Sequence, residues 1–383
     1  MRKRLPAFVK KIHLQLAFYL LVAFCGWFLH LGCQPIKALG KNPAGEDLKK
    51  IEALPNYNNG QFQNLETFPA ARSNTSSRKG PRWIGLLKYF AGKPKNTKPS
   101  QLLPSVKTDL RHLRYEIPTV TWFGHSSFLI TTSTATILFD PSFSGFAGPF
   151  PGMIRAFDGS NVYNVNDMPV IDALVISHDH YDHLDYKTVK ALKKKVKRVI
   201  VPMGVGSHFR KWGYDAAMIT ELNWHDSVAL PNGVNITATP AHHRSNRTFE
   251  QRKTLWASYV IKVDGYKIYF SGDTGYSRHF SMIGERYGPF DLALMECGQY
   301  NLKWSQNHMF PWQTARAAID LKTAMVMPMH WGKFAESEHT WNEPVNLLMA
   351  SADSFHLPVT VPYIGEPYTI GEKRTAARWW NFQ

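Results

Sequence analysis

The segment HDHYDH, residues 178–183, constrains the fold and chemistry of this chain more than any other feature. It places three histidines and two aspartates directly after the aliphatic run 170–176, which predicts a buried strand. In a turn after a strand, alternate side chains such as His178 and His180 can point to one side, whereas Asp182 and His183 can address a second point. Such ligands suit zinc, with iron and manganese as alternatives. We therefore predict two metal ions; a hydrogen-bonded polar turn would not need so many ligand-type side chains.

Three later segments repeat the pattern of an apolar run that ends in histidine or aspartate. They are VNITATPAHHRS (234–245), YKIYFSGDTGY (266–276) and TAMVMPMHWG (323–332). Functional residues gather at strand ends on one edge of α/β structures, so these segments are expected to meet. Earlier in the chain, the runs 119–132 and 135–143 predict an opening hairpin, and residues 186–196 predict a helix with lysines on its polar side. Strands with intervening helical segments predict an α/β fold of layered sheets and helices.

The spacing H-x-H-x-D-H after an aliphatic strand resembles the metallo-β-lactamase superfamily. This resemblance implies an αββα sandwich, in which two sheets lie between helices and a dinuclear metal site lies at one edge. It also implies that Asp273 in SGDTGY bridges the metals. By the family pattern, the ligands of one metal are His178, His180 and His243, and those of the other are Asp182, His183 and His330. His242 competes with His243, although the family pattern favours the second histidine of such a pair.

Several longer motifs resemble the family of phospholipases D that hydrolyse N-acylphosphatidylethanolamine. They are WFGHSS (122–127), LFDPSFS (138–144), RT followed by LW within 247–256, SGDTGY (271–276), and HWGKF with EHTWNEP (330–344). The resemblance implies a membrane phospholipid substrate, N-acylethanolamine and phosphatidic acid as products, and Asp182, Asp273 and His308 as catalytic residues. Sugar-phosphate lactonases carry related WxGHSS and HWG patterns. A metal-dependent lactonase, or another phosphoester hydrolase with a soluble substrate, is therefore an alternative.

Three residues outside the predicted ligand set need separate interpretation. His308 in QNHMFPWQ precedes a helix-like segment and matches a family histidine that lies at the substrate phosphate; a surface histidine is the alternative. His125 in GHSS is expected to support a ligand or shape a turn, because the ligand set is complete without it. Cys297 is expected to be a small buried hydrophobic residue, since no activating partner is evident.

The N-terminal residues predict membrane attachment. The basic start MRKRLPAFVKK leads into the apolar run LQLAFYLLVAFCGWFLHLGC, so residues 1–33 are predicted to be a signal sequence or membrane anchor. Cys33 after Gly32 makes lipoprotein anchoring an alternative. With the basic end retained in the cytoplasm, the rest of a bacterial chain would face outward, on the periplasmic side. We therefore expect a membrane-associated protein.

Residues 34–116 are rich in Pro, Asn, Ser and Lys and predict a basic arm ahead of a metallo-β-lactamase-fold hydrolase domain at 117–383. The excess of basic over acidic residues is N-terminal, whereas residues 116–383 hold 25 Lys and Arg against 24 Asp and Glu. A basic, membrane-proximal arm predicts contact with an anionic membrane surface. The nearly neutral domain argues against nucleic acid as a partner, and the sequence predicts no particular oligomeric state.

The predicted chemistry is hydrolysis of a phosphodiester. Two divalent ions would lower the pKa of a shared water to about neutrality, so that hydroxide could attack phosphorus. The ions and His308 would then stabilise charge on the phosphoryl oxygens. A non-catalytic, membrane-bound protein that binds metal or lipid is the remaining alternative, and turnover would distinguish it from an enzyme.

Overall fold

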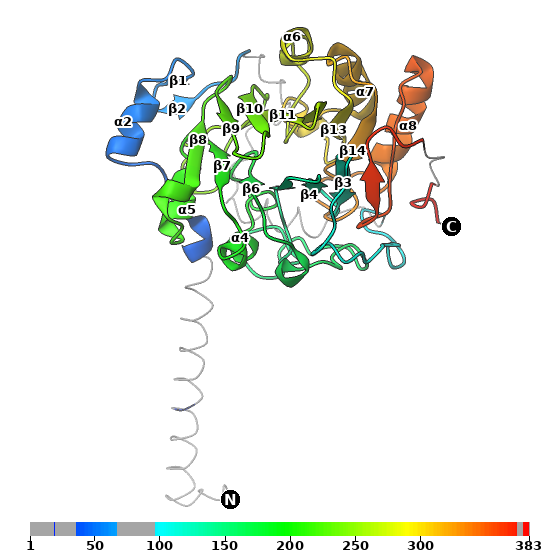
Figure 1. Cartoon of the computed structure of the whole chain (residues 1–383), viewed down its shortest axis with the longest axis horizontal. Helices are drawn as coiled ribbons and strands as arrows, with labels where there is room; N and C mark the ends of the chain where they lie inside the picture. Colours follow the sequence, from blue (N-terminus) through cyan, green and yellow to red (C-terminus); the bar gives the residue numbers. More distant parts are fainter. Residues whose placement is uncertain (1–18, 20–35, 67–95, 374–377, 383) are drawn as a thin grey trace, which may run out of the picture.

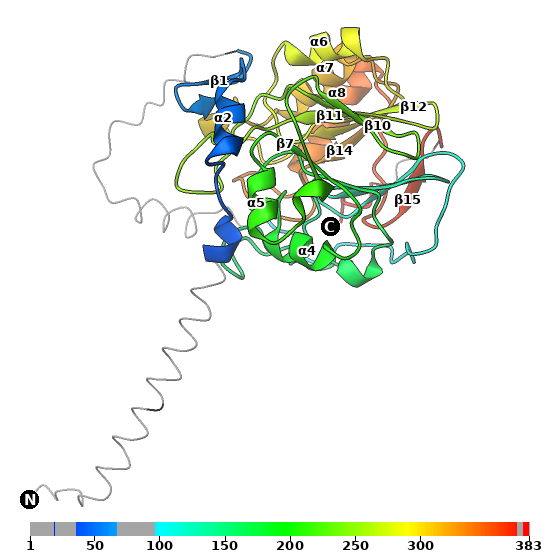
Figure 2. The same cartoon turned by 60° about the vertical axis from the view of Figure 1, so that its left-hand side comes forward.

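The computed structural model describes residues 19, 36–66, 96–373 and 378–382. In this part of the chain the strands form two large sheets and a small hairpin, and helices cover the outer face of each sheet (Figures 1 and 2). Figure 2 shows one helical layer at the top and one at the bottom, with the strands between them. The upper layer contains α6 (His279–Arg286), α7 (Pro311–Asp320) and α8 (Glu343–Phe355), and the lower layer contains α4 (Tyr186–Leu192) and α5 (Gly206–Lys211). The predicted αββα sandwich is confirmed.

The first sheet has seven strands in the order β15-β3-β4-β5-β6-β7-β8. Its strands are β3 (Thr119–Trp122), β4 (Phe128–Thr131), β5 (Thr136–Phe139), β6 (Ala173–Val175), β7 (Val199–Pro202), β8 (Ile219–Leu222) and β15 (Pro367–Thr369). Neighbours from β15 to β5 pair antiparallel, and neighbours from β5 to β8 pair parallel. The segment HDHYDH follows β6, one of the parallel strands.

The second sheet has six strands in the order β14-β13-β12-β11-β10-β9. Its strands are β9 (Ser227–Ala229), β10 (Asn235–Thr239), β11 (Ser258–Val263), β12 (Tyr266–Phe270), β13 (Leu292–Glu296) and β14 (Val326–Met329). Strands β12, β13 and β14 run parallel, so their carboxyl ends lie at one edge of the sheet. The chain after β12 carries Asp273, and the residue after β14 is His330.

The core explains why the strands are almost continuously apolar. In β4, Phe128 and Ile130 face the second sheet. Leu129 points to the other face and packs in the core between the first sheet and helices α4 and α5. The sheets meet closely, with ring centroids of Phe139 and Phe270 4.9 Å apart. A strand that is buried on both faces has no polar side to alternate with its apolar one, and so reads as a short aliphatic run.

Two predicted elements differ in their bounds. The run 119–132 contains both β3 and β4, because the chain turns at Gly124 and His125, which have φ values of 81° and 55°. Helix α4 ends at Leu192 rather than at residue 196, since Val196 instead forms a parallel bridge with Ile171 beside β6.

The predicted arm is described in part, and its described residues pack on the domain. They form α2 (Glu46–Glu52) and a hairpin of β1 (Tyr57–Asn58) and β2 (Gln61–Phe62). Ile51, Phe62 and Leu103 are buried and belong to the same continuous hydrophobic cluster as the core between the sheets. Linker-like composition did not indicate this packing, and the domain boundary at residue 117 stays a prediction.

The predicted membrane segment, residues 1–33, lies outside the described residues apart from Tyr19. Among the residues that the structure describes, no helix combines the length and apolar character needed to cross a bilayer.

Candidate metal centre

The loop that carries HDHYDH is held by a carboxylate at the end of β5. Oδ1 of Asp140 accepts a hydrogen bond from the Ser177 amide at 2.8 Å, and its Oδ2 lies 2.8 Å from Nδ1 of His183. Asp140 is fully buried. Because Asp140 engages Nδ1, the other ring nitrogen of His183 is left to face the site. The motif LFDPSFS contained Asp140, but sequence reasoning did not assign it this role.

Three histidines and one aspartate form a first group of ligand-type atoms. Nε2 of His178 lies 2.8 Å from Nδ1 of His180, and Nε2 of His243 lies 3.3 Å from that same atom. Oδ2 of Asp273 lies 3.8 Å from Nε2 of both His178 and His243. Ligand atoms of these four residues all lie within 4.8 Å of one another. The structure thus brings together the residues that the family pattern assigns to one metal.

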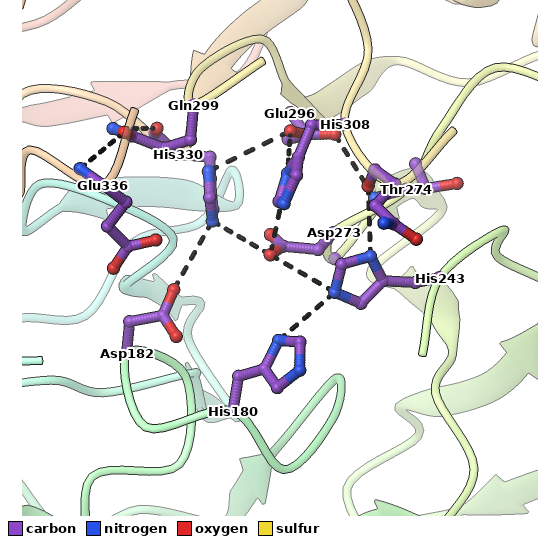
Figure 3. Close-up of polar contacts among 12 residues, drawn as sticks. His180, Asp182, His243, Asp273, Thr274, Glu296, Gln299, His308, His330 and Glu336 are labelled. Carbon is purple, nitrogen blue, oxygen red and sulfur yellow. Dashed lines mark hydrogen bonds and ion pairs between the residues drawn. The ribbon is translucent and has the colours of Figure 1, made fainter. Parts of the chain in front are cut away.

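A second group contains Asp182, His183 and His330, together with His125. Oδ2 of Asp182 lies 3.0 Å from Nε2 of His183 and 3.5 Å from Nε2 of His330. Asp273 connects this group to the first. Its Oδ1 lies 3.1 Å from Nε2 of His183, and its Oδ2 lies 3.0 Å from Nε2 of His330, as Figure 3 shows. Its carboxylate therefore lies where it could contact two cations.

The donor atoms of this cluster fit bound metal. Nε2 of His183, Nε2 of His330 and Oδ1 of Asp273 are buried, and their close approaches to one another and to Asp182 lack hydrogen-bond geometry, so none has a hydrogen-bond partner among the described residues. Buried polar atoms are normally hydrogen-bonded, so three unsatisfied atoms converging on one point need another partner. Imidazole nitrogens and carboxylate oxygens are the donors that zinc and similar ions prefer. The chain thus contains a His/Asp cluster able to bind metal.

Burial and charge set the protonation of the cluster. Burial lowers the pKa of His178 and His243 well below its ordinary value, so both rings are neutral at pH 7, as metal ligands must be. Burial is the largest single effect on His183 and His330 and lowers their pKa, but the surrounding carboxylates, Asp273 foremost and Asp182 with it, together outweigh burial and raise the pKa of both rings. For Asp273 itself, burial raises the pKa, but the two histidines outweigh that effect and hold it well below the usual range. Asp273 is therefore ionised at pH 7 and available to a cation.

His308 lies beside the cluster rather than on an open surface. Its ring centroid is 5.1 Å from that of His330 and 5.3 Å from that of His243. Its Nδ1 lies 2.7 Å from Oε1 of Glu296, at the end of β13, and 4.0 Å from Oδ2 of Asp273. Sequence reasoning did not single out Glu296, although the apolar run LALME (292–296) also ends in an acid.

Two other polar residues complete the surroundings of Asp182. Nε2 of His125 lies 2.8 Å from Oδ2 of Asp182, and the His125 ring is fully buried, which lowers its pKa to about 3. A neutral ring can orient Asp182 through this contact, in agreement with the supporting role expected for His125. Glu336, which sequence reasoning also missed, is near enough that the charge of Asp182 adds to burial in raising its pKa to about 8.

The structure places His243 and His242 differently. His243 belongs to the metal group, and its backbone is held from both sides by Asn64 of the arm. His242 does not belong to any of the metal-type groups found among the described residues, and its amide donates to Oγ1 of Thr274. Cys297 is fully buried, and burial raises the pKa of its thiol well above the ordinary value, as suits a small core residue rather than a nucleophile.

A cavity of about 500 Å³ opens over the cluster. Its polar wall includes His180, Asp182, His243, His308 and Glu336. Its apolar wall includes Ala147, Pro149, Met153, Ile154 and Trp304. Ligand sites commonly combine a large apolar lining with a few converging polar groups, and this cavity has both.

Comparisons with known proteins agree with the fold and with its family. Residues 135–331 match the family described as the beta-lactamase superfamily domain. An uncharacterized protein of Mycobacterium tuberculosis is 34% identical over 363 residues, covering 92% of this chain and 96% of the relative. The N-acyl-phosphatidylethanolamine-hydrolyzing phospholipase D 1 of Caenorhabditis elegans is 32% identical over 232 residues, covering 56% of this chain and 64% of the relative.

Of two further similar proteins, one matches a smaller part of this chain and the other has a lower sequence identity. The outer membrane protein RomA of Klebsiella pneumoniae is 46% identical over 106 residues, which are 28% of this chain and 80% of the relative. The metallo hydrolase Igni18 of the archaeon Ignicoccus hospitalis aligns with a TM-score of 0.53 at 23% identity, covering 67% of this chain and 99% of that one. The latter likeness bears on the fold alone.

The layered fold and the cluster at its sheet edge define a metal-dependent hydrolase. With the matched domain spanning more than half of the sequence, the chain belongs to the beta-lactamase superfamily.

Proposed function

We propose that this protein is a phospholipase D that uses two zinc ions to hydrolyse N-acylphosphatidylethanolamine to N-acylethanolamine and phosphatidic acid. The observation that carries the proposal is the cavity, whose lining combines the metal-type cluster and His308 with several apolar side chains. A phospholipid presents the same combination, because an anionic phosphodiester adjoins long acyl chains. The relative in Caenorhabditis elegans, whose name states this activity, supports the choice of substrate.

Zinc held by the two ligand groups would supply Lewis acidity and a hydroxide at neutral pH, with iron or manganese as alternative metals. His178, His180 and His243 would hold one ion, and Asp182, His183 and His330 the other. Asp273 would contact both, because its two oxygens already face the two groups.

His308 would stabilise charge on the phosphoryl oxygens. Since Nδ1 of His308 is engaged by Glu296 at 2.7 Å, Nε2 is the ring nitrogen left to face a substrate oxygen, to which it would donate from a ring that carries a proton on both nitrogens. In the reaction, a new bond forms between a water-derived oxygen and phosphorus, and the bond from phosphorus to the ethanolamine oxygen breaks. The departing oxygen takes a proton, which yields N-acylethanolamine.

We also propose that the protein works at a membrane, on its outward, periplasmic side in a bacterial cell. The basic, apolar-rich residues 1–33 support an anchor or a signal sequence, with lipidation of Cys33 as the alternative. The basic arm supports attraction to anionic lipid, at about 1 kcal/mol for each Lys or Arg near the surface.

The test uses the full chain loaded with zinc, with metal content measured by mass spectrometry, and N-acylphosphatidylethanolamine in mixed micelles made with ¹⁸O-water. Wild type is expected to release N-acylethanolamine and to place the label in phosphatidic acid, because attack occurs at phosphorus. Asp182→Ala and His243→Ala are expected to lose the activity, whereas the matched control His242→Ala keeps it. Zinc-loaded wild type that hydrolyses lactones or soluble phosphoesters but not this lipid would refute the proposal. Bound metal without turnover of any of these substrates would indicate a binding protein.

A further inference from the structure

Arg244 brings a positive charge to the cavity wall directly after the metal-type residue His243. It lines the cavity and is half-buried. Within the described part of the chain, no carboxylate lies within ion-pair distance of its guanidinium and no hydrogen bond from it is found. Other arginines are matched, since Arg210 pairs with Asp47 at 2.7 Å and with Glu221 at 3.1 Å.

The surroundings add to this charge rather than cancel it. Burial lowers the pKa of Arg244, and the positive charge of Arg252 lowers it further, so a second guanidinium stands nearby. Glu66 is the acid in this region: burial lowers the pKa of His242, and the charge of Glu66 partly opposes that effect. The Glu66 carboxylate is, however, already paired with Arg278 at 3.1 Å. The wall beside His243 therefore carries positive charge that the described side chains do not neutralise.

A half-buried guanidinium without a counter-ion is costly, and binding an anion relieves the cost. Its planar fork of N–H donors matches two oxygens of a phosphate, which it can bind with two parallel hydrogen bonds. The metal-type cluster and Arg244 line the same cavity, and Arg244 directly follows His243 of the cluster, so a phosphate ester in this cavity has access to both.

We propose that Arg244 is a phosphate-binding residue that makes the site selective for anionic phosphoesters over neutral esters and lactones. This inference rests on the proposed function for its choice of lipid, but the ligand chemistry is that of any phosphate ester. Arg244 is a specificity-determining residue, because it binds oxygens that neither attack nor leave.

The experiment measures binding of inorganic phosphate to the zinc-loaded full chain by calorimetry, together with kcat and KM for a soluble phosphodiester, for micellar N-acylphosphatidylethanolamine and for a neutral lactone. Arg244→Gln is expected to weaken phosphate binding by about 10- to 100-fold, the range for losing a charge-assisted contact, at unchanged zinc content. It should raise KM for the phosphoesters without changing KM for the lactone. Arg244→Lys, which keeps the charge but loses the fork, should recover part of the affinity. Lys253→Gln is the matched control: it removes one positive charge from the same loop, where the ammonium donates to the Gly60 carbonyl.

The outcomes separate this inference from the proposed function. If Arg244→Gln and Lys253→Gln both bind phosphate as tightly as wild type, Arg244 is not a phosphate ligand, even when the lipid is hydrolysed. If Arg244→Gln loses phosphate affinity but wild type does not hydrolyse the lipid, Arg244 remains a phosphate ligand and only the proposed lipid substrate is refuted. If Arg244→Gln loses zinc, the test is made with Arg244→Lys instead. A phosphate affinity of Arg244→Lys equal to that of wild type would overturn the proposed contact with two parallel hydrogen bonds.

Discussion

Replacing Asn64 by alanine should weaken metal binding from a residue that cannot itself touch the metal. Asn64 follows β2 in the arm, and its side chain makes paired hydrogen bonds to the backbone of His243. Nδ2 donates to the His243 carbonyl at 3.0 Å, and Oδ1 accepts from the His243 amide at 3.1 Å. Oδ1 also accepts from the indole of Trp256 at 2.9 Å.

The magnitude follows from the groups that the substitution leaves without partners. The Trp256 indole still reaches the Ala241 carbonyl at 3.0 Å, so the loss falls mainly on the amide and carbonyl of His243. A buried polar group left unsatisfied costs about 1–3 kcal/mol. Two groups lose their partner here, but water that reaches the half-buried Asn64 site offsets part of the cost, so we expect a stability loss of about 2–4 kcal/mol. Loss of a group that orients a metal ligand typically weakens metal binding by about 10- to 100-fold, which we expect here.

Zinc affinity is measured by competition with a chromophoric chelator, and stability by urea unfolding of the metal-free chain. Asn58→Ala is the control, because Asn58 is exposed in the same hairpin and its side chain accepts only from the neighbouring Asn59 amide, at 2.9 Å, among the bonds found. If Asn64→Ala bound zinc as tightly as Asn58→Ala, the arm would not position His243 and this reasoning would fail.

Other predictions test the supporting groups. His125→Ala should weaken zinc binding about tenfold and leave the metal-to-protein ratio unchanged, because His125 acts through Asp182; a lower ratio in elemental analysis would make His125 a ligand. Lys333 is buried, and burial lowers its pKa from the model-peptide value of 10.5 to about 7. Above pH 7 the unfolded chain holds this proton more tightly than the folded chain, so stability should rise with pH between about 7 and 10 by roughly 1 kcal/mol per unit, and Lys333→Met should remove that slope in urea titrations. A free zinc concentration 100 times the dissociation constant should stabilise the fold by about 3 kcal/mol for each site, and excess chelator should reverse the rise in melting temperature. A melting temperature that changes neither with added zinc nor with excess chelator would show that the cluster holds no zinc.

Local patterns sufficed for the layered fold because its signals lie within short stretches of chain. The aliphatic run before HDHYDH contains β6, and the runs ending in SGDTGY and HWG contain β12 and β14. Parallel strands carry their terminal residues to a common edge, which is why these motifs meet. The same logic would have found Glu296 at the end of β13, but the run there ends in a single acid and lacks a histidine beside it.

Contacts between residues that are far apart in the sequence could not be predicted from local patterns. Asn64 and His243 are 179 positions apart, and Asn64 lies in a stretch whose Pro, Asn and Gly content resembles a linker. Asp140 and His183 are 43 positions apart, and an aspartate before proline indicates a turn more readily than a support for a ligand. The choice between His242 and His243 likewise depended on which backbone position the arm and the loop after β10 hold toward the cluster.

The beginning of the arm bears on how the cavity would meet a membrane. Ala38 accepts a hydrogen bond at 2.8 Å from the buried guanidinium of Arg247, which also donates to the Asp179 carbonyl inside HDHYDH. Ala38 and Pro149 line one small cavity, and Pro149 also belongs to the apolar wall of the larger cavity over the cluster. Ala38 is five positions after residue 33, and an extended chain spans at most about 3.6 Å per position, or roughly 18 Å. If residues 1–33 anchor the chain, Ala38 and the small cavity that it shares with Pro149 would therefore lie near the end of the anchor, on the membrane side of the domain.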